Sequence, residues 1–219
     1  MSIRAILFDL DGTLVDTERE SAEAMARALA GGQGVEITQA DRDGIIGRSW
    51  VEIYRNLKDQ YRQIEWTVHE LIAETARIRE QMLGETGLEP LPGVAGLLDR
   101  FADMPKAVVT GSSRSEAEHA LALLGIRDHF RALYAAEDVP SSKPDPAGYL
   151  MGAQALDVAP EHCVVLEDSS AGIAAGRAAG ALVVAIKIGN FANQDQSQAH
   201  AIVDTLDHVT HELFEGLLG

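Results

Sequence analysis

Apolar residues in this chain fall into short runs that alternate with longer stretches of helical periodicity. Five runs rich in apolar and β-branched residues predict strands at residues 3–8, 107–110, 132–135, 163–166 and 182–186. Residues 115–124 and 170–179 carry apolar side chains at the spacing of one helix face. This alternation is typical of α/β folds in which helices cover both faces of a parallel sheet. We therefore predict a Rossmann-like, three-layer α/β core.

A long interval between the first two predicted strands breaks this alternation. It covers residues 9–106, whereas a crossover between parallel strands needs only about a dozen residues. Four stretches within it have helical patterns, at residues 18–30, 40–46, 50–60 and 67–82, with turn-like segments at 31–34 and 47–49. We predict that residues 16–87 form an inserted α-helical cap domain and that residues 1–15 and 88–219 form the α/β core domain.

The composition narrows the classes of partner. The 219 residues include 18 Lys and Arg against 34 Asp and Glu, which gives a net charge of −16. No basic cluster stands out, so we expect no nucleic-acid partner and no binding to an anionic membrane, because both depend on clustered Lys and Arg. An anionic small-molecule substrate would need a local positive charge or a metal ion. The oligomeric state is not indicated.

Features of secreted and membrane proteins are missing from the pattern. The apolar run near the N-terminus is too short for a signal peptide, and no run of about 18 apolar residues could span a bilayer. We therefore expect a cytoplasmic protein. The single cysteine, Cys163, lies in an apolar run, and we expect a buried thiol rather than a disulfide or a cysteine-rich metal site.

Acidic residues directly follow two of the predicted strands, where open α/β sheets bind their ligands. Asp9 and Asp11 are two residues apart in extended chain, so their side chains share one face, and Asp168 adds a third carboxylate from another strand end. Hard oxygen ligands with few neighbouring His or Cys favour Mg²⁺ over Zn²⁺. Taken alone, Asp9 and Asp11 also fit a turn or a helix cap.

Two further segments indicate a site for a phosphoryl group. Thr110 offers a hydroxyl, and Gly111 and Ser112 offer backbone N–H groups at a helix start. Lys143 supplies the positive charge that phosphoryl transfer requires. Singly, the Thr-Gly-Ser segment also fits a plain turn, and Lys143 also fits a solvent-facing lysine. The joint occurrence of these residues after strand-like runs is much more specific.

In this order, the segments resemble the four motifs of the haloacid dehalogenase superfamily. The matching residues are 8–13 (FDLDGT), 109–112 (VTGS), 142–145 (SKPD) and 166–169 (LEDS), so the resemblance extends over essentially the whole chain. The helical insert resembles the small cap of the branch that contains β-phosphoglucomutase and phosphoglycolate phosphatase.

The resemblance implies a phospho-aspartate mechanism for this site. Asp9 would attack phosphorus, and Asp11 would protonate the leaving oxygen and later activate water. Mg²⁺ would be held by Asp9, by the backbone carbonyl of Asp11 and by Asp168, with Glu167 as an indirect or alternative ligand. Thr110 and Lys143 would complete the catalytic set, and Gly111 and Ser112 would bind the phosphoryl group.

The function we predict is a Mg²⁺-dependent phosphatase for a small phosphorylated metabolite, with sugar phosphates favoured. A phosphomutase of the β-phosphoglucomutase type would use the same residues and stays an alternative, as does, more remotely, a non-catalytic binding protein with this fold. Dehalogenases of the superfamily lack the second aspartate, so Asp11 argues against dehalogenation. Phosphonate hydrolases of the superfamily use a cap lysine that forms a Schiff base. The only lysine of this insert is Lys58, in a polar helix, which argues against phosphonate hydrolysis.

Two cap residues are predicted to contact the substrate. Arg48 opens a predicted cap helix in a segment that resembles the substrate-facing segment of sugar-phosphate enzymes. A surface arginine at a helix start is the alternative reading of Arg48. Glu18 follows the first linker and is placed to reach a sugar hydroxyl, although this chain has Arg19 where the family often has Pro.

Overall fold

The structure is a computed structural model that describes residues 2–46, 48 and 50–218, without the side chains of Glu18 and Thr86. Contacts between Cα atoms divide the chain into two compact units. Met1–Asp16 together with Leu88–Gly219 form one unit, which we call the core, and Thr17–Gly87 form the other, which we call the cap.

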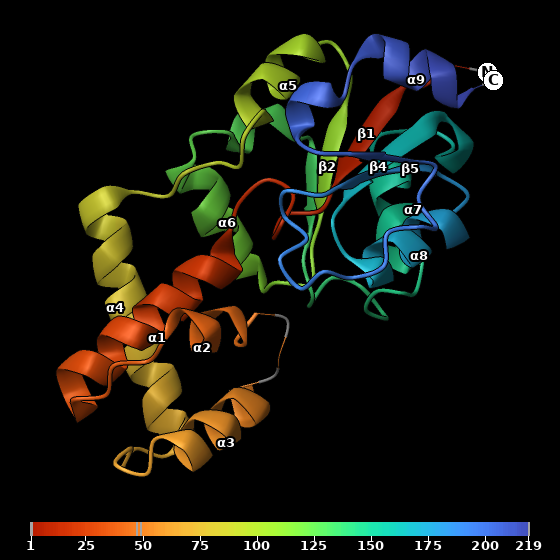
Figure 1. The fold of residues 1–219 in the computed structure, drawn as a ribbon. Helices are drawn as coiled ribbons and strands as arrows, with labels where there is room; N and C mark the ends of the chain where they lie inside the picture. Colours follow the sequence, from red (N-terminus) through yellow and green to blue (C-terminus); the bar gives the residue numbers. More distant parts are fainter. Residues whose placement is uncertain (1, 47, 49, 219) are drawn as a thin grey trace. The chain divides into compact units, whose positions relative to one another are not determined.

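A parallel six-stranded sheet forms the centre of the core. Its strands are β1 (Ala5–Phe8), β2 (Lys106–Val109), β3 (Ala132–Tyr134), β4 (Cys163–Glu167), β5 (Leu182–Ile186) and β6 (Ala201–Val203). They lie in the order β3-β2-β1-β4-β5-β6, and the central ones are labelled in Figure 1. The direction of winding reverses between β1 and β4, so the carboxyl ends of these two strands flank the topological switch point.

Both faces of this sheet are covered. On one face, side chains of β1, β2 and β4 form a buried cluster with α7 (Ala147–Ala155) and α8 (Ser170–Ala178). The crossover through α6 (Arg114–Leu123) runs opposite to the one through α7, so right-handed connections place these two helices on opposite faces. The second face contains Phe8, whose ring meets that of Phe130 edge-on, with centroids 5.4 Å apart.

Two further helices complete the core. They are α5 (Val94–Arg100) and α9 (His211–Leu217), and the rings of Phe101 and Phe214 stack between them at 4.9 Å. Short 3-10 helices occur at Arg127–His129, Pro160–His162 and Leu206–His208.

In the part of the cap that the structure describes, the chain forms a helical bundle of α1 (Thr17–Gln33), α2 (Gln39–Asp43), α3 (Trp50–Gln60) and α4 (Val68–Thr86). It has its own buried cluster, in which Leu29, Leu57 and Leu71 meet. The N-termini of α2 and α4 are closed by capping boxes that begin at Thr38 and Thr67. Among the helices that the structure describes, none is both long and apolar enough to cross a membrane.

The predicted α/β fold with a parallel sheet is confirmed, and the differences lie in particular elements. Strand β6 and helices α5, α7 and α9 were not predicted from the pattern. Helix α7 buries residues on more than one side, so it lacks the apolar stripe of a surface helix. The predicted turn at residues 31–34 is wrong, because α1 continues to Gln33, and the helix predicted at 40–46 ends at Asp43.

Candidate active site

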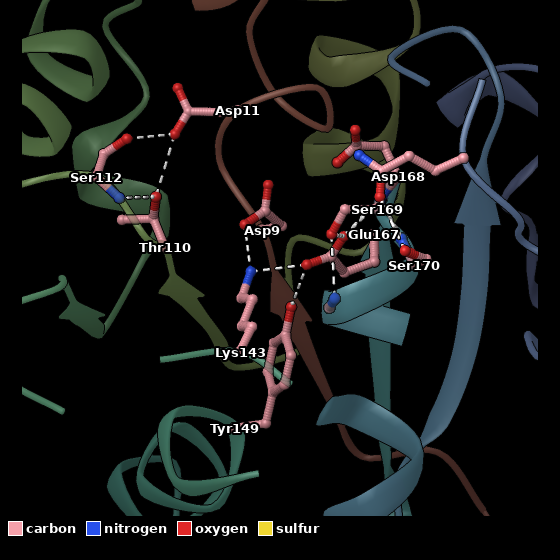
Figure 2. Close-up of polar contacts among 12 residues, drawn as sticks. Asp9, Asp11, Thr110, Ser112, Lys143, Tyr149, Glu167, Asp168, Ser169 and Ser170 are labelled. Carbon is pink, nitrogen blue, oxygen red and sulfur yellow. Dashed lines mark hydrogen bonds and ion pairs between the residues drawn. The ribbon is translucent and has the colours of Figure 1, made fainter. Parts of the chain in front are cut away.

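The loop after β1 carries two carboxylates in different environments. Asp9 directly follows the strand and is buried, while Leu10 turns into the packing. Asp11 comes two residues later, and its carboxylate meets the loop after β2. Figure 2 shows Asp9 and Asp11 with separate sets of partners.

Two hydroxyl groups after β2 hold Asp11. The hydroxyls of Thr110 and Ser112 donate to Oδ2 of Asp11 at 3.2 and 2.5 Å. The backbone N–H of Ser112 in turn donates to Oγ1 of Thr110 at 3.0 Å, which closes the turn. Ser113 then caps α6 through a capping box, so this turn lies at a helix N-terminus. Backbone N–H groups at such a position suit an oxyanion.

Lys143 joins the carboxylates of two strands. Its ammonium donates to Oδ1 of Asp9 and to Oε1 of Glu167, the latter at 2.7 Å. Burial acts to lower the pKa of Lys143, but the charges of Asp9 and Glu167 outweigh it and hold this pKa well above its usual range. Lys143 therefore stays protonated and supplies a fixed positive charge beside Asp9.

Glu167, at the end of β4, is fully buried and accepts hydrogen bonds on both carboxylate oxygens. Oε1 accepts from Lys143 and from the phenol of Tyr149 at 3.0 Å. Oε2 accepts from the backbone N–H groups of Asp168 and Ser169 and from the hydroxyl of Ser169, at 2.8 to 2.9 Å. Burial and the charge of Glu167 hold the pKa of Tyr149 well above its usual range, so the phenol remains a donor.

Asp9, Glu167 and Asp168 form an acidic trio whose ligand oxygens lie within 4.8 Å of one another. Burial, and then the neighbouring carboxylates, raise the pKa of Asp168 to about 9. Burial also raises the pKa of Asp9 to about 8, although Lys143 opposes it. Like charges this close and this buried favour a shared cation, and a donor set made only of oxygen fits Mg²⁺. The residues present therefore fit the predicted metal.

Two glycines lie against these carboxylates. Gly12 has φ of 82°, and a Cβ there would lie 2.4 Å from Oδ2 of Asp168. A Cβ at Gly172, in α8, would lie 1.5 Å from Oε1 of Glu167. Any larger residue at either position would displace a carboxylate of the site.

The structure brings most of the predicted site residues together at the carboxyl edge of the sheet (Figure 2): Asp9, Asp11, Thr110, Ser112, Lys143, Glu167 and Asp168. Gly111 is exposed within the turn after β2. Arg48 is exposed in the cap and lines a cavity of about 300 Å³ there. The side chain of Glu18 lies outside the described residues. The ammonium of Lys58 donates to the carbonyl of Ile64 at 2.8 Å, within the cap.

Three residues of the site were not predicted from the sequence. They are Tyr149, Gly172 and the buried Gln196, whose amide donates to the carbonyls of Asp168 and Ile186 at 2.7 and 3.0 Å. Gly172 follows the fourth motif in a predicted helix, a position where glycine is unfavourable, and this signal could have identified it. Tyr149 and Gln196 offer no comparable signal.

Comparison with known proteins gives a consistent family. The family model of haloacid dehalogenase-like hydrolases matches residues 3–180. The chain is similar to fructose-1-phosphate phosphatase YqaB of Escherichia coli K12, with 36% identity over 185 residues, which cover 84% of this chain and 96% of that protein. It is also similar to hexitol phosphatase A of the same organism, with 34% identity over 202 residues, which cover 85% of this chain and 84% of the relative.

Solved structures show the same likeness over nearly the whole chain. The fold matches the crystal structure of a putative β-phosphoglucomutase from Thermotoga maritima with a TM-score of 0.82 and 27% identity. The match covers 97% of this chain and 99% of that chain.

Proposed function

Because the chain belongs to the haloacid dehalogenase-like hydrolase family and is a phosphoric monoester hydrolase, we propose that it is a Mg²⁺-dependent phosphatase that hydrolyses a small sugar phosphate through a phospho-aspartate intermediate. The family match and the relatives confirm the resemblance that the four motifs predicted. One observation carries the proposal: Asp9 is paired with a fixed cation, whereas Asp11 is held by neutral hydroxyls. Two carboxylates in such different surroundings suit different roles.

The first half of the proposed reaction makes a bond from Asp9 to phosphorus. A carboxylate oxygen of Asp9 attacks as the ester oxygen leaves with its electron pair, and Asp11 donates a proton to that oxygen. Lys143 balances the negative charge on Asp9 and on the phosphoryl oxygens. The N–H groups of Gly111 and Ser112 bind and orient the phosphoryl group, that of Ser112 in exchange for its bond to Oγ1 of Thr110, while the hydroxyl of Thr110 stays on Asp11.

The second half releases phosphate. Asp11, now a carboxylate, takes a proton from a water molecule, whose oxygen attacks phosphorus while the bond to Asp9 breaks. Thr110 and Ser112 hold Oδ2 of Asp11 in place for both proton transfers.

The residues that would hold the metal are Asp9, Asp168 and the backbone carbonyl of Asp11, with Glu167 as an indirect or alternative ligand. When bound, Mg²⁺ supplies positive charge that neutralises the phosphoryl oxygens. Gln196 fixes the backbone carbonyl of Asp168, which keeps this ligand at the site.

A sugar phosphate is the substrate class that the relatives favour. Fructose-1-phosphate phosphatase and hexitol phosphatase are named for phosphorylated polyhydroxy compounds. Within this chain, we propose that the cap residues Arg48 and Glu18 contact the hydroxyls of the substrate. Arg48 lines its cavity together with the polar residues Asp41, Asn56 and Gln60, which offer both donors and acceptors.

A phosphomutase is the second candidate, and the likeness to a putative β-phosphoglucomutase favours it. It would use the same nucleophile and the same acid, but the phosphoryl group would return to the sugar instead of passing to water. Isomerisation of a hexose phosphate without release of phosphate would identify this activity.

The test is phosphate release from a panel of sugar phosphates, hexitol phosphates, phosphoglycolate and nucleotides, with Mg²⁺ and with excess chelator. Chelator-sensitive release from a few sugar phosphates is the expected result. Release that is insensitive to the chelator would contradict the metal dependence. If no phosphate is released and β-glucose 1-phosphate is isomerised in the presence of a bisphosphate primer, the protein is a phosphomutase rather than a phosphatase.

A further inference from the structure

Tyr149 is a buried phenol at the base of the site. It lies in α7 with 1% of its surface exposed, and its hydroxyl donates to Oε1 of Glu167 at 3.0 Å. The ammonium of Lys143 lies 5.1 Å from the centre of its ring. Tyr149 thus touches both charged groups that stand behind Asp9, although neither the motifs nor the proposed reaction gives it a role (Figure 2).

The two oxygens of Glu167 are held in different ways. Oε2 is held by its own turn, through the backbone of Asp168 and Ser169 and the Ser169 hydroxyl. Among the described residues, the donors to Oε1 are Lys143 and Tyr149. Loss of the phenol would leave Oε1 with a single charged donor, and Glu167 would then draw Lys143 more strongly away from Asp9.

Close packing of α7 on the sheet brings the phenol to this oxygen. A Cβ at Gly148 would lie 2.7 Å from Cγ1 of Val109, and one at Gly152 would lie 3.1 Å from Cδ2 of Leu7. These two glycines let α7 approach β1 and β2 closely enough for Tyr149 to reach the end of β4. A phenylalanine would fill the same apolar space, so packing alone does not account for the hydroxyl.

We propose that Tyr149 is a positioning residue whose hydroxyl fixes Oε1 of Glu167 and thereby keeps the ammonium of Lys143 on Asp9 and on the phosphoryl group. The inference rests on the proposed function, because it assigns Lys143 to the reacting phosphoryl group. We expect the effect on kcat more than on KM, because Tyr149 is buried and its hydroxyl donates to Glu167.

The first test compares Tyr149→Phe with Tyr134→Phe. Tyr134, on β3, packs partly buried against the same core cluster but has no place in the site, so it is the matched control. We expect Tyr149→Phe to lower kcat about tenfold with KM within about twofold, and Tyr134→Phe to leave both unchanged. Thermal unfolding of both variants is measured alongside. Unchanged kcat in Tyr149→Phe would overturn the proposal.

A double-mutant cycle with Glu167→Gln separates positioning from general destabilisation. If Tyr149 acts through Glu167, the Tyr149→Phe change costs less than about twofold in kcat once Glu167 is already Gln. The same tenfold loss in both backgrounds would show that Tyr149 acts independently of Glu167, and the proposal would be wrong.

A spectroscopic readout keeps this inference distinct from the proposed function. The ¹H–¹⁵N signal of the Lys143 ammonium, assigned with Lys143→Arg, reports its hydrogen bonds without any substrate. We expect the signal to shift in Tyr149→Phe and to stay in place in Tyr134→Phe. An unchanged signal would overturn the positioning of Lys143 by Tyr149, whatever the activity. Failure of the wild type to turn over any phosphate ester would overturn the proposed function, and with it the link to the phosphoryl group, while a shifted signal would still support the positioning.

Discussion

The carboxyl groups at the candidate active site in the core and those at two helix starts in the cap have pKa values shifted in opposite directions. In the core, burial raises the pKa of Asp9 to about 8 and that of Asp168 to about 9. In the cap, burial is also the largest single influence on Asp41 and acts to raise its pKa, but the hydrogen bonds from Tyr61 and Thr38 together outweigh it and lower the pKa. Hydrogen bonds from Thr67 likewise lower the pKa of Glu70.

The direction of the pKa shift distinguishes carboxyl groups suited to reaction from those that stabilise a helix. A carboxylate that caps a helix at the surface gains donors and stays charged, which stabilises the helix. The carboxylates of Asp9, Glu167 and Asp168 are instead crowded and buried, so their charge is costly until a cation shares it. The buried carboxylates are therefore suited to metal binding and chemistry, whereas Asp41 and Glu70 stabilise the starts of cap helices.

The largest expected effect comes from the nucleophile. Asp9→Asn removes the attacking oxygen charge, and we expect phosphate release to fall by at least about 10³-fold while the fold is kept. The matched control is Asp59→Asn, at an exposed site in α3, which should leave kcat within about twofold. Both are measured by release of inorganic phosphate. Full turnover by Asp9→Asn would exclude the covalent mechanism.

A smaller loss of activity is expected when a methyl group is added beside Glu167. The added Cβ of Gly172→Ala overlaps Oε1 of Glu167, so we expect kcat to fall about 10- to 100-fold and stability to fall by about 1–3 kcal/mol. Gly216→Ala, in α9, meets nothing within 4 Å and should be neutral or stabilising by up to about 1 kcal/mol. Equal activity of the two variants would show that Glu167 tolerates displacement.

In the cap, the expected effect is on selectivity. Arg48→Ala should raise KM for the preferred sugar phosphate about tenfold, because it removes a charged donor. Hydrolysis of an aryl phosphate without a sugar should be unaffected. Arg55→Ala, at another exposed position of the cap, is the control. If Arg48→Ala lowered kcat for both substrates equally, the division between chemistry in the core and selection in the cap would be wrong.

The smallest effect is a shift in the pH dependence of stability. Asp9 and Asp168 have folded-state pKa values of about 8 and about 9, above the ordinary value of 3.8 for an aspartate. Without metal, the folded state therefore holds more protons than the unfolded state between about pH 4 and pH 9, and the free energy of unfolding falls as the pH rises through that window.

Metal binding should reverse this trend, because both carboxylates must ionise to bind Mg²⁺. We expect the increase in Tm caused by Mg²⁺ to be several degrees larger at pH 8 than at pH 6, as measured by calorimetry against a chelator. The cap acids Asp41 and Glu70 have lowered pKa values, so the stability they contribute is lost only as the pH falls below about 4, with or without Mg²⁺. An equal increase at pH 6 and pH 8 would contradict the raised pKa values.

Local signals accounted for much of the fold and for the motif residues. Alternating apolar runs predicted five of the strands, and the polar residues after them pointed to Asp9, Thr110, Lys143 and Asp168. The edge strand β6 was not predicted because it has three residues, of which Ile202 is exposed. Helix α7 was not predicted because a helix that is buried on several sides has no amphipathic pattern.

The sequence by itself determined the parallel α/β fold and the order of polar groups at the strand ends, because the periodicity of two or 3.6 residues and the side chains after each strand are local properties. Tertiary structure alone decided how deeply Asp9 and Asp168 are buried, that Tyr149 reaches Glu167, and that Gly172 leaves room for that carboxylate. These contacts join residues from different strands and helices, and they depend on packing distances between elements that no local pattern encodes.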